Sequence, residues 1–267
     1  MLPGQSRADA LMKSIVTTVR DTLVFGPAIL FRGVLQRDIL GAVAVKTPLG
    51  AIAIRPSDSD MSVLRQVFVR RDYDISKLRQ FSRIYNRYMQ ILESGRIPII
   101  IDAGANIGAS AIWFASLFPS AKILAVEPDP INANLCTINC KRYSNVSVIE
   151  AAIGSVPGNA RLVRPDTMSW SIQIERSDGE GSVQLTTVDE LLSPFASTGV
   201  LFIAKIDIEG FERDLFSSAT QWLADVAAVI IELHDWLIPY SSIPFQKAIA
   251  RCEAEMAILG ENLIFIS

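Results

Sequence analysis

The chain has 267 residues, of which half are hydrophobic and a fifth are charged. This composition fits one large buried core of an α/β domain with an added N-terminal region, and it argues against a disordered chain. The formal net charge of −3 leaves no basic excess to neutralise a phosphate backbone. We therefore expect no nucleic acid as a partner.

The amino-terminal region has no charged segment followed by an apolar run and a cleavage site, so we expect no signal peptide. Residues 23–35 are apolar but are broken by glycine, proline and arginine. They are also too short to cross a bilayer, which needs about 20 apolar residues. We expect no transmembrane segment and a cytoplasmic location.

Three cysteines do not suggest a secreted disulfide framework. Cys136 and Cys140 are four residues apart and would share one face of a helix. No second Cys/His pair accompanies them, so we expect buried side chains and not a zinc site.

The first part of the chain is predicted to contain helices and one hairpin. The expected elements are one or two helices within residues 1–40, two short strands within 42–54 around a Thr-Pro-Leu-Gly turn, and a helix over 74–94 that Gly95 ends.

From residue 97 the pattern changes to alternating strands and helices. We expect strands at 97–102, 122–126, 146–149, 200–206, 227–233 and 262–266, and helices at 109–118, 130–142, after Thr187, 211–223 and 244–258. Continuously apolar strands in this alternation predict a parallel sheet covered on both faces. The fold class is therefore α/β, Rossmann-like and doubly wound, with an N-terminal extension at 1–95 and a cofactor-binding domain at 96–267. Residues 154–186 are more polar, and 160–182, with Arg164 and Trp170, is a candidate lid.

The segment Asp102-Ala-Gly-Ala-Asn-Ile-Gly108 joins the first strand of this sheet to a helix, where such folds bind ligands. Gly104 and Gly108 allow unusual backbone angles and close approach of a ligand. The alternative is a glycine-rich turn with no ligand.

Two ligands compete for this turn. A dinucleotide fingerprint has a second glycine where this chain has Asn106. The asparagine side chain hinders the close approach of a pyrophosphate to the backbone. Glu127 ends the second strand and can accept both ribose hydroxyls, which suits NAD and S-adenosylmethionine equally. Asp102 can sit near an ammonium or sulfonium cation, which only the methyl donor supplies. The residues favour S-adenosylmethionine.

The ordered series IDAGANIG, AVEPDP, AAIG, KIDIEGFE and IELH resembles the FkbM family of methyltransferases over roughly residues 45–240. The resemblance implies a class I methyltransferase type of fold, S-adenosylmethionine as cofactor, and O-methylation of sugars or other natural-product hydroxyls. By position, it implies the cofactor-binding residues Asp102, Gly104, Ala105, Asn106 and Gly108 at the methionine part, Glu127 and Pro128 at the ribose, and Ala151 and Ala152 beside the adenine. It also implies that Asp207 faces the transferring methyl.

The candidate catalytic residues are Asp207, Glu209 and His234, at the ends of the fourth and fifth strands. Asp207 and Glu209 alternate along an extended segment, so they are expected to point to opposite sides. We expect Asp207 toward the cofactor and Glu209 toward the acceptor or the next helix start. His234, the only histidine, is the candidate base, although a lone histidine is more often structural.

Other residues near this edge have weaker interpretations. Asp207, Glu209, His234 and Asp235 are possible magnesium ligands. They lack a defining ligand spacing, so no metal is expected. Lys205 lies inside a strand and should reach a carboxylate or the edge of the sheet. The aromatic rings of Trp236 and Tyr240 are either core or a sugar-stacking wall.

The end of the chain departs from the family pattern. Such folds close with two further strands after the fifth, and only 262–266 reads as one. Either a strand is missing, or it is misread, or a second subunit completes the sheet, so a homodimer is an expected partner along with a small-molecule or sugar acceptor. The function predicted is an O-methyltransferase. The alternatives are an NAD-dependent oxidoreductase and an inactive cofactor-binding scaffold.

Overall fold

The computed structural model of the chain describes residues 7–27, 29, 42–56, 58–163, 173–177 and 183–267. Two compact units, Met1–Arg71 and Asp72–Ser267, make up the chain. This division differs from the predicted boundary after residue 95, because helix α3 (Phe81–Glu93) packs on strands of the second unit. Among the described residues, none of the helices has both the length and the apolar character that a membrane crossing needs.

The first unit joins a long helix to the predicted hairpin. Its elements are α1 (Arg7–Phe25), β1 (Val43–Thr47), β2 (Gly50–Ile54) and α2 (Asp60–Leu64), which continues as a π-helical turn at Arg65–Arg70. The hairpin around Pro48 and Leu49 is confirmed by the antiparallel pairing of Thr47 with Gly50. Arg65 Nη2 lies 2.7 Å from Asp21 Oδ2, which ties the π-helical turn to α1.

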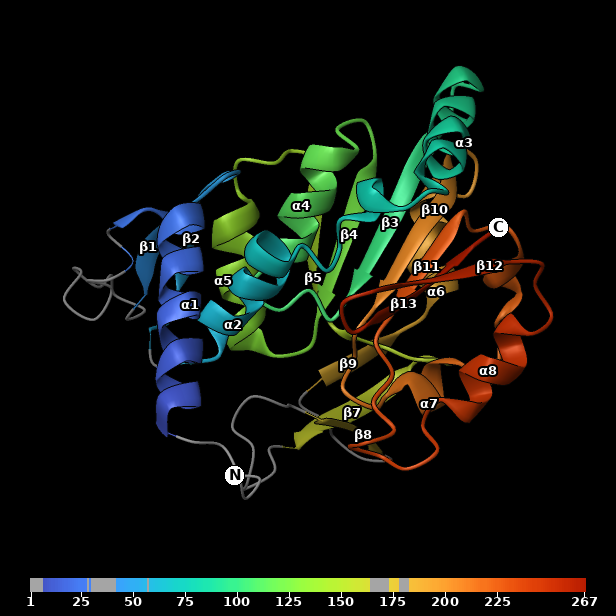
Figure 1. Cartoon of the computed structure of the whole chain (residues 1–267). Helices are drawn as coiled ribbons and strands as arrows, with labels where there is room; N and C mark the ends of the chain where they lie inside the picture. The colour runs from blue at the N-terminus through green and yellow to red at the C-terminus, as the bar shows by residue number, and fades with distance from the viewer. Residues whose placement is uncertain (1–6, 28, 30–41, 57, 164–172, 178–182) are drawn as a thin grey trace. The chain divides into compact units, whose positions relative to one another are not determined.

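The second unit is built on a seven-stranded sheet of order β12-β13-β11-β10-β3-β4-β5 (Figure 1). The strands are β3 (Ile97–Ala103), β4 (Lys122–Glu127), β5 (Val146–Glu150), β10 (Gly199–Ile206), β11 (Ala228–Ile231), β12 (Glu255–Leu259) and β13 (Asn262–Ile266). The pairs from β11 to β5 are parallel, and β13 runs antiparallel to both of its neighbours. The predicted, mostly parallel sheet is confirmed.

Helices cover both faces of this sheet, as a doubly wound fold requires. On one face, Tyr88 of α3 contacts the rings of Phe118 and Phe202, and α4 (Ala109–Leu117) and α5 (Pro130–Cys140) continue this layer. On the other face, Ile99 and Ile101 share a buried cluster with residues from three helices, α6 (Val188–Leu192), α7 (Glu212–Leu215) and α8 (Ile243–Ile249).

Two helix predictions near the end of the chain are wrong in extent. The helix expected at 211–223 is divided into α7 and a 3₁₀ helix at Gln221–Ala224, and Ala219, with a left-handed φ of 52°, lies between them. The helix expected at 244–258 stops at Ile249, and its second half forms strand β12, which pairs with β13. Pairing with β13 here overrides the helix propensity of Glu, Met and Leu. The strand that seemed absent is therefore present as β12, where the sequence had suggested a helix. The homodimer was expected partly to supply this strand, so it stays a prediction without that support.

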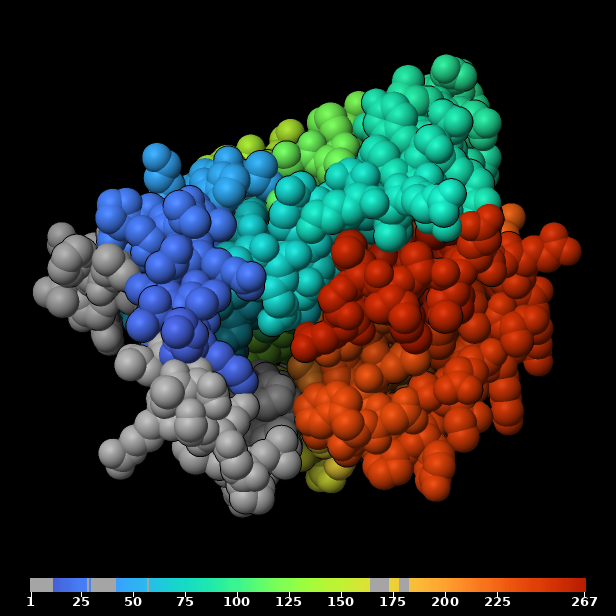
Figure 2. Space-filling view, viewed as in Figure 1, coloured from blue at the N-terminus to red at the C-terminus, as the bar shows by residue number. Residues whose placement is uncertain are grey.

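The C-terminal hairpin β12–β13 also packs against the segment that begins α3, as the adjoining surfaces in Figure 2 show. Glu255 of β12 accepts hydrogen bonds from Gln80 Nε2 at 3.0 Å and from Arg83 Nη1 at 2.9 Å. Arg83 Nη2 donates to the carbonyl of Ile266 at 3.2 Å. These contacts fix the far edge of the sheet within its own unit.

The polar region after β5 forms a separate four-stranded sheet of order β6-β9-β7-β8. Its strands are β6 (Ala152–Ile153), β7 (Gly158–Val163), β8 (Gln173–Ser177) and β9 (Val183–Thr186). The predicted hairpin is confirmed as β7–β8, and the predicted capping box of Thr187 and Glu190 starts α6. Arg164 and Trp170 lie outside the described residues, so the lid stays a prediction.

Candidate functional site

The glycine-rich turn lies directly after β3, the fifth strand of the seven in spatial order, and leads into α4. Gly104 has φ +74°, and a Cβ there would lie 1.8 Å from the carbonyl oxygen of Asp207. Gly108 has φ +85°, and a Cβ there would lie 2.8 Å from Cys136 Sγ. Both glycines are therefore required by close packing as well as by backbone angle.

Asp102 lies below this turn and is fully buried. Its Oδ2 accepts a hydrogen bond from Ser110 Oγ at 2.7 Å, and its Oδ1 lies 3.1 Å from Lys205 Nζ. Lys205 Nζ also donates to the carbonyl of Gly104 at 2.7 Å. Although burial disfavours its charge, Asp102 and Asp207 raise the pKa of Lys205. The expected carboxylate partner of Lys205 is confirmed, and Asp102 supports the turn from below.

Glu127 ends β4 and is hydrogen-bonded to the glycine turn. Its Oε2 accepts from the backbone N–H of Asn106 at 2.8 Å, and its Oε1 accepts from the N–H of Asp129 at 3.0 Å. Asn106 has a left-handed φ of 50°, which asparagine tolerates better than most residues. Burial raises the pKa of Glu127 to about 7, against the lowering effect of these hydrogen bonds. A carboxylate is thus held beside the turn at the edge where β3 and β4 end.

The remaining predicted cofactor residues lie around the same edge. Ala105 is buried in the turn, and Pro128 follows Glu127. Ala151 and Ala152 follow β5, and these residues are 4% and 1% exposed, within the hydrophobic core. The structure therefore brings the predicted residues to the ends of three adjacent strands.

The expectation that Asp207 and Glu209 point to opposite sides is wrong. Asp207 Oδ1 lies 3.6 Å from His234 Nε2, and Glu209 Oε2 lies 3.7 Å from the same nitrogen. The alternation fails because the chain leaves the extended conformation after β10. Glu209 has a left-handed φ of 54°, a costly angle for a residue with a side chain.

His234 is 1% exposed and lies among carboxylates. Its Nδ1 is 2.9 Å from Glu212 Oε1, and its Nε2 is 3.8 Å from Glu232 Oε1. Burial lowers its pKa, but the hydrogen bond to Glu212 and the nearby carboxylates outweigh this effect and raise the pKa to about 9. Burial and the charge of Asp207 raise the pKa values of Glu209 and Glu232 to about 7. The imidazole is therefore cationic at neutral pH in the ligand-free protein.

Sequence reasoning missed three residues of this cluster. Tyr73 OH donates to Asp207 Oδ2 at 3.2 Å, across 134 positions of the chain, which no local pattern reveals. Glu212 is fully buried inside a short helix, where an exposed acid would be expected. Glu232 is the residue directly after β11, and this position at a strand end is the signal by which the sequence could have revealed it.

Two other features carry no predicted site residue. Cys136 and Cys140 are buried with their sulfurs 4.0 Å apart under Gly108, which confirms the prediction of packed side chains.

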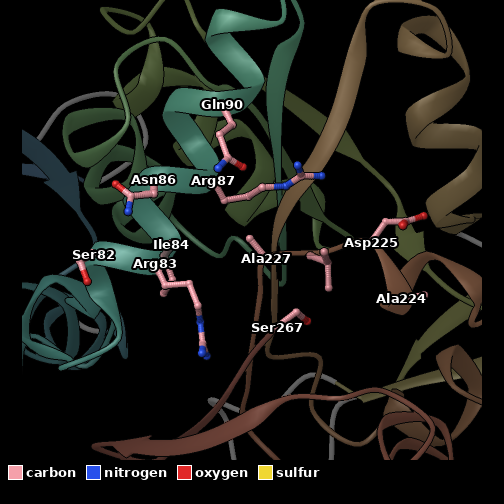
Figure 3. A pocket seen from close by; sticks show the side chains of 11 residues that line it. Ser82, Arg83, Ile84, Asn86, Arg87, Gln90, Ala224, Asp225, Ala227 and Ser267 are labelled. Carbon is pink, nitrogen blue, oxygen red and sulfur yellow. The ribbon is translucent and has the colours of Figure 1, made fainter.

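A pocket of about 510 Å³ is lined by Arg83, Arg87 and Gln90 of α3 and by residues 224–227 and 267 (Figure 3). Residues 224–227 come just before β11, so this pocket lies at the amino end of that strand. The candidate site lies at the carboxyl ends of the strands, on the opposite side of the sheet.

Comparison with known proteins assigns the chain to a protein family. A family model described as the methyltransferase FkbM domain matches residues 102–241. The chain is 24% identical to the 2-O-methyltransferase NoeI of Sinorhizobium fredii over 182 residues, covering 61% of this chain and 74% of that protein. It is 26% identical to the hexuronic acid methyltransferase AglP of Haloferax volcanii over 149 residues, covering 55% of this chain and 60% of that protein.

Solved structures show only distant likeness. The crystal structure of monomeric WbdD matches 72% of this chain and 41% of its own, with 15% identity and a TM-score of 0.38. The chain thus spans less than two thirds of WbdD and of AglP. Because the family model covers more than half of the residues, this chain belongs to the FkbM methyltransferase family.

Proposed function

We propose that the protein is an S-adenosylmethionine-dependent O-methyltransferase acting on a hydroxyl of a sugar or another small glycan or natural-product acceptor. The proposal depends on one observation, which is that the candidate cofactor residues and the acid–histidine cluster lie at the same edge of the sheet. The glycine turn after β3, the carboxylate after β4 and the acid–histidine cluster after β10 and β11 all stand at the carboxyl ends of parallel strands. Membership of a methyltransferase family supports this function over a nicotinamide oxidoreductase.

The residues at this edge fit the methyl donor. Gly104–Gly108 would take the methionine part, and the Glu127 carboxylate, held next to the Asn106 N–H, would accept the ribose hydroxyls. Ala151 and Ala152 would border the adenine. Asp102 is enclosed by Lys205 and Ser110, so its support for the cofactor would be indirect, through the turn. The donor supplies a methyl group on a positively charged sulfur.

The acceptor would meet this methyl group beside Asp207, Glu209 and His234. Trp236 and Tyr240 follow β11 and are 57% and 73% exposed, and the Trp236 ring centre lies 6.1 Å from that of His234. The exposed Trp236 ring next to the acidic cluster suits a sugar, whose C–H faces pack on rings while its hydroxyls reach polar groups. The name of NoeI gives O-methylation and the name of AglP gives a hexuronic acid as acceptor, and similarity to both supports O-methylation of a sugar by this chain.

The acceptor oxygen forms a bond to the methyl carbon while the carbon–sulfur bond breaks, and the hydroxyl proton must leave. Asp207 Oδ2 already accepts from Tyr73, and His234 Nδ1 is held by Glu212. Glu209 Oε2 is buried and has no hydrogen-bond partner among the described residues. We therefore assign proton acceptance to Glu209, with Asp207 and His234 orienting the hydroxyl. Positioning of donor and acceptor in line can lower the barrier by about 7–11 kcal/mol.

Transfer of a radiolabelled methyl group tests this function. The purified protein, the labelled donor and a panel of monosaccharides, hexuronic acids and aglycone alcohols would be incubated, and label would be counted in the extracted acceptors. We expect label in at least one sugar hydroxyl, and a loss of label in Asp207→Asn. Label in none of these acceptors, or undiminished label with Asp207→Asn, would contradict the proposal.

A further inference from the structure

The ends of β10 and β11 bring three metal-ligating side chains together. Asp207, Glu232 and His234 each offer one ligand atom, and these atoms lie within 4.8 Å of one another. His234 Nε2 is 3.6 Å from Asp207 Oδ1 and 3.8 Å from Glu232 Oε1. Ligands bound to one divalent cation at about 2.0–2.2 Å stand about 3–4 Å apart, so these separations suit a shared ion.

The orientation of His234 is fixed for such a role. Its Nδ1 is hydrogen-bonded to the fully buried Glu212, which turns Nε2 toward the other carboxylates. This arrangement of a carboxylate behind a histidine is the usual support of a metal-binding imidazole. Among the described residues, the hydrogen bond of the ring is the contact of Nδ1 with Glu212, and the side chain is only 2% exposed. Nε2 faces the carboxylates of Asp207, Glu209 and Glu232 at 3.6–3.8 Å, which is longer than a hydrogen bond and leaves room for a ligand between them.

The carboxylates around Nε2 are also arranged for a cation. Tyr73 donates to Asp207 Oδ2, so Oδ1 of the same carboxylate is left to face His234. Glu209 Oε2 lies 3.7 Å from Nε2, is buried, and has no hydrogen-bond partner among the described residues. Asp235 is not part of the group, because its Oδ1 accepts from the N–H of Ser242.

We propose that Asp207, Glu232 and His234 bind one divalent cation, with Glu209 beside it. One imidazole combines with two carboxylates here, so the set joins a ligand type that suits the later first-row ions with one that suits Mn²⁺ and Mg²⁺. A first-row divalent ion fits this mixed set, and Mn²⁺ is a paramagnetic member of that class used as the probe below. The sequence already offers Asp207 and His234 as possible ligands, and the structure adds Glu232 to them and leaves Asp235 out.

The role of the ion rests on the proposed function, whereas its binding does not. An acceptor hydroxyl bound to the cation would have a lowered pKa. Its proton would pass to Glu209, its oxygen would bond to the methyl carbon, and the sulfur would keep the electron pair of the broken carbon–sulfur bond. The charges balance, because the sulfonium becomes a neutral thioether as one proton is released.

Titration of the whole chain with Mn²⁺, after chelator treatment and without cofactor, tests the binding. Electron paramagnetic resonance measures free Mn²⁺ for the wild type, for Glu232→Gln and for Asp207→Asn. The matched control is Glu253→Gln, an exposed acid outside the cluster. We expect one ion per chain in the wild type and the control, and affinity at least about tenfold weaker in each cluster variant. Thermal unfolding followed by circular dichroism identifies a cluster variant that fails to fold. The Mn²⁺ affinity of the other cluster variant then tests the proposal.

Wild-type binding weaker than about 1 mM would overturn the proposal. Equal affinity in the wild type and a folded cluster variant would overturn it as well, because the ion would then bind elsewhere. Binding of S-adenosylhomocysteine, measured separately by calorimetry, keeps the two proposals distinct. Its loss would count against the methyltransferase function and leave the Mn²⁺ result standing.

Discussion

Lys205 and Asp102 form an enclosed ion pair directly beneath the glycine turn, with Nζ 3.1 Å from Oδ1 and both residues at most 1% exposed. The same Nζ donates to the carbonyls of Ala103 and Gly104. Strand β10 therefore holds the backbone turn of β3 through one cationic side chain. Such a pair stabilises the turn chiefly because removal of either partner leaves a buried charge.

Lys205→Met is expected to lower the free energy of unfolding by about 3–5 kcal/mol, since the charge of Asp102 would remain buried without its partner. Urea unfolding followed by tryptophan fluorescence measures the change. The double variant Lys205→Met with Asp102→Asn removes both charges and should recover part of the loss. A single variant within about 1 kcal/mol of the wild type would show that the pair is not structural.

Gly104→Ala and Gly95→Ala separate close packing from backbone angle, because both glycines have φ +74°. Nothing lies within 4 Å of a Cβ at Gly95, whereas a Cβ at Gly104 would lie 1.8 Å from the carbonyl oxygen of Asp207. We expect Gly95→Ala to cost about 1–2 kcal/mol, from the left-handed angle alone.

Gly104→Ala should cost clearly more and should also abolish cofactor binding, because the turn must move. Unfolding and calorimetry on the two variants measure both effects. Equal stabilities, with cofactor affinity kept in Gly104→Ala, would refute the role given to this turn.

Cofactor affinity should depend on pH through Glu127, whose pKa is raised to about 7 by burial. The ionised form accepts the ribose hydroxyls, so the affinity should be full above pH 7 and should fall by about tenfold for each pH unit below it. Calorimetry between about pH 5.5 and pH 8 measures the profile. In Glu127→Gln the affinity should be low and flat across this range. A wild-type profile as flat as that of the variant would remove Glu127 from the ribose site.

His234→Ala is expected to keep cofactor binding and to lose rate by about 10²-fold, because the carboxylates around Nε2 lose the group that orients them. The dissociation constant and the rate of label transfer, measured on the same preparation, separate the two effects. Full activity in this variant would exclude His234 from the chemistry.

Sequence patterns predicted the centre of the fold better than its ends. Strands β3, β4 and β10 are mostly apolar, and a carboxylate lies at or next to the end of each, so both their burial and their shared edge follow from local sequence. Strand β12 was missed because Glu255–Leu259 has helical propensity, and only pairing with β13 makes it a strand. Propensity is a local quantity, whereas that pairing is tertiary.

The same distinction applies to the site. Gly104 and Gly108 stood out because a tight strand-to-helix turn needs glycines at that spacing, and Glu127 stood out because it ends the next strand. The orientation of Glu209 was not, because its left-handed φ depends on packing after β10. Tyr73 and Glu212 reach the cluster from separate segments, so their contacts with Asp207 and His234 exist only in the folded chain.

Calorimetric titration of the purified chain with S-adenosylhomocysteine, next to a parallel fluorescence titration with NADH, tests the central claim most directly. The account predicts micromolar affinity for the demethylated methyl donor, lost in Glu127→Ala, and no binding of the dinucleotide. Binding of NADH without binding of S-adenosylhomocysteine or S-adenosylmethionine would contradict it.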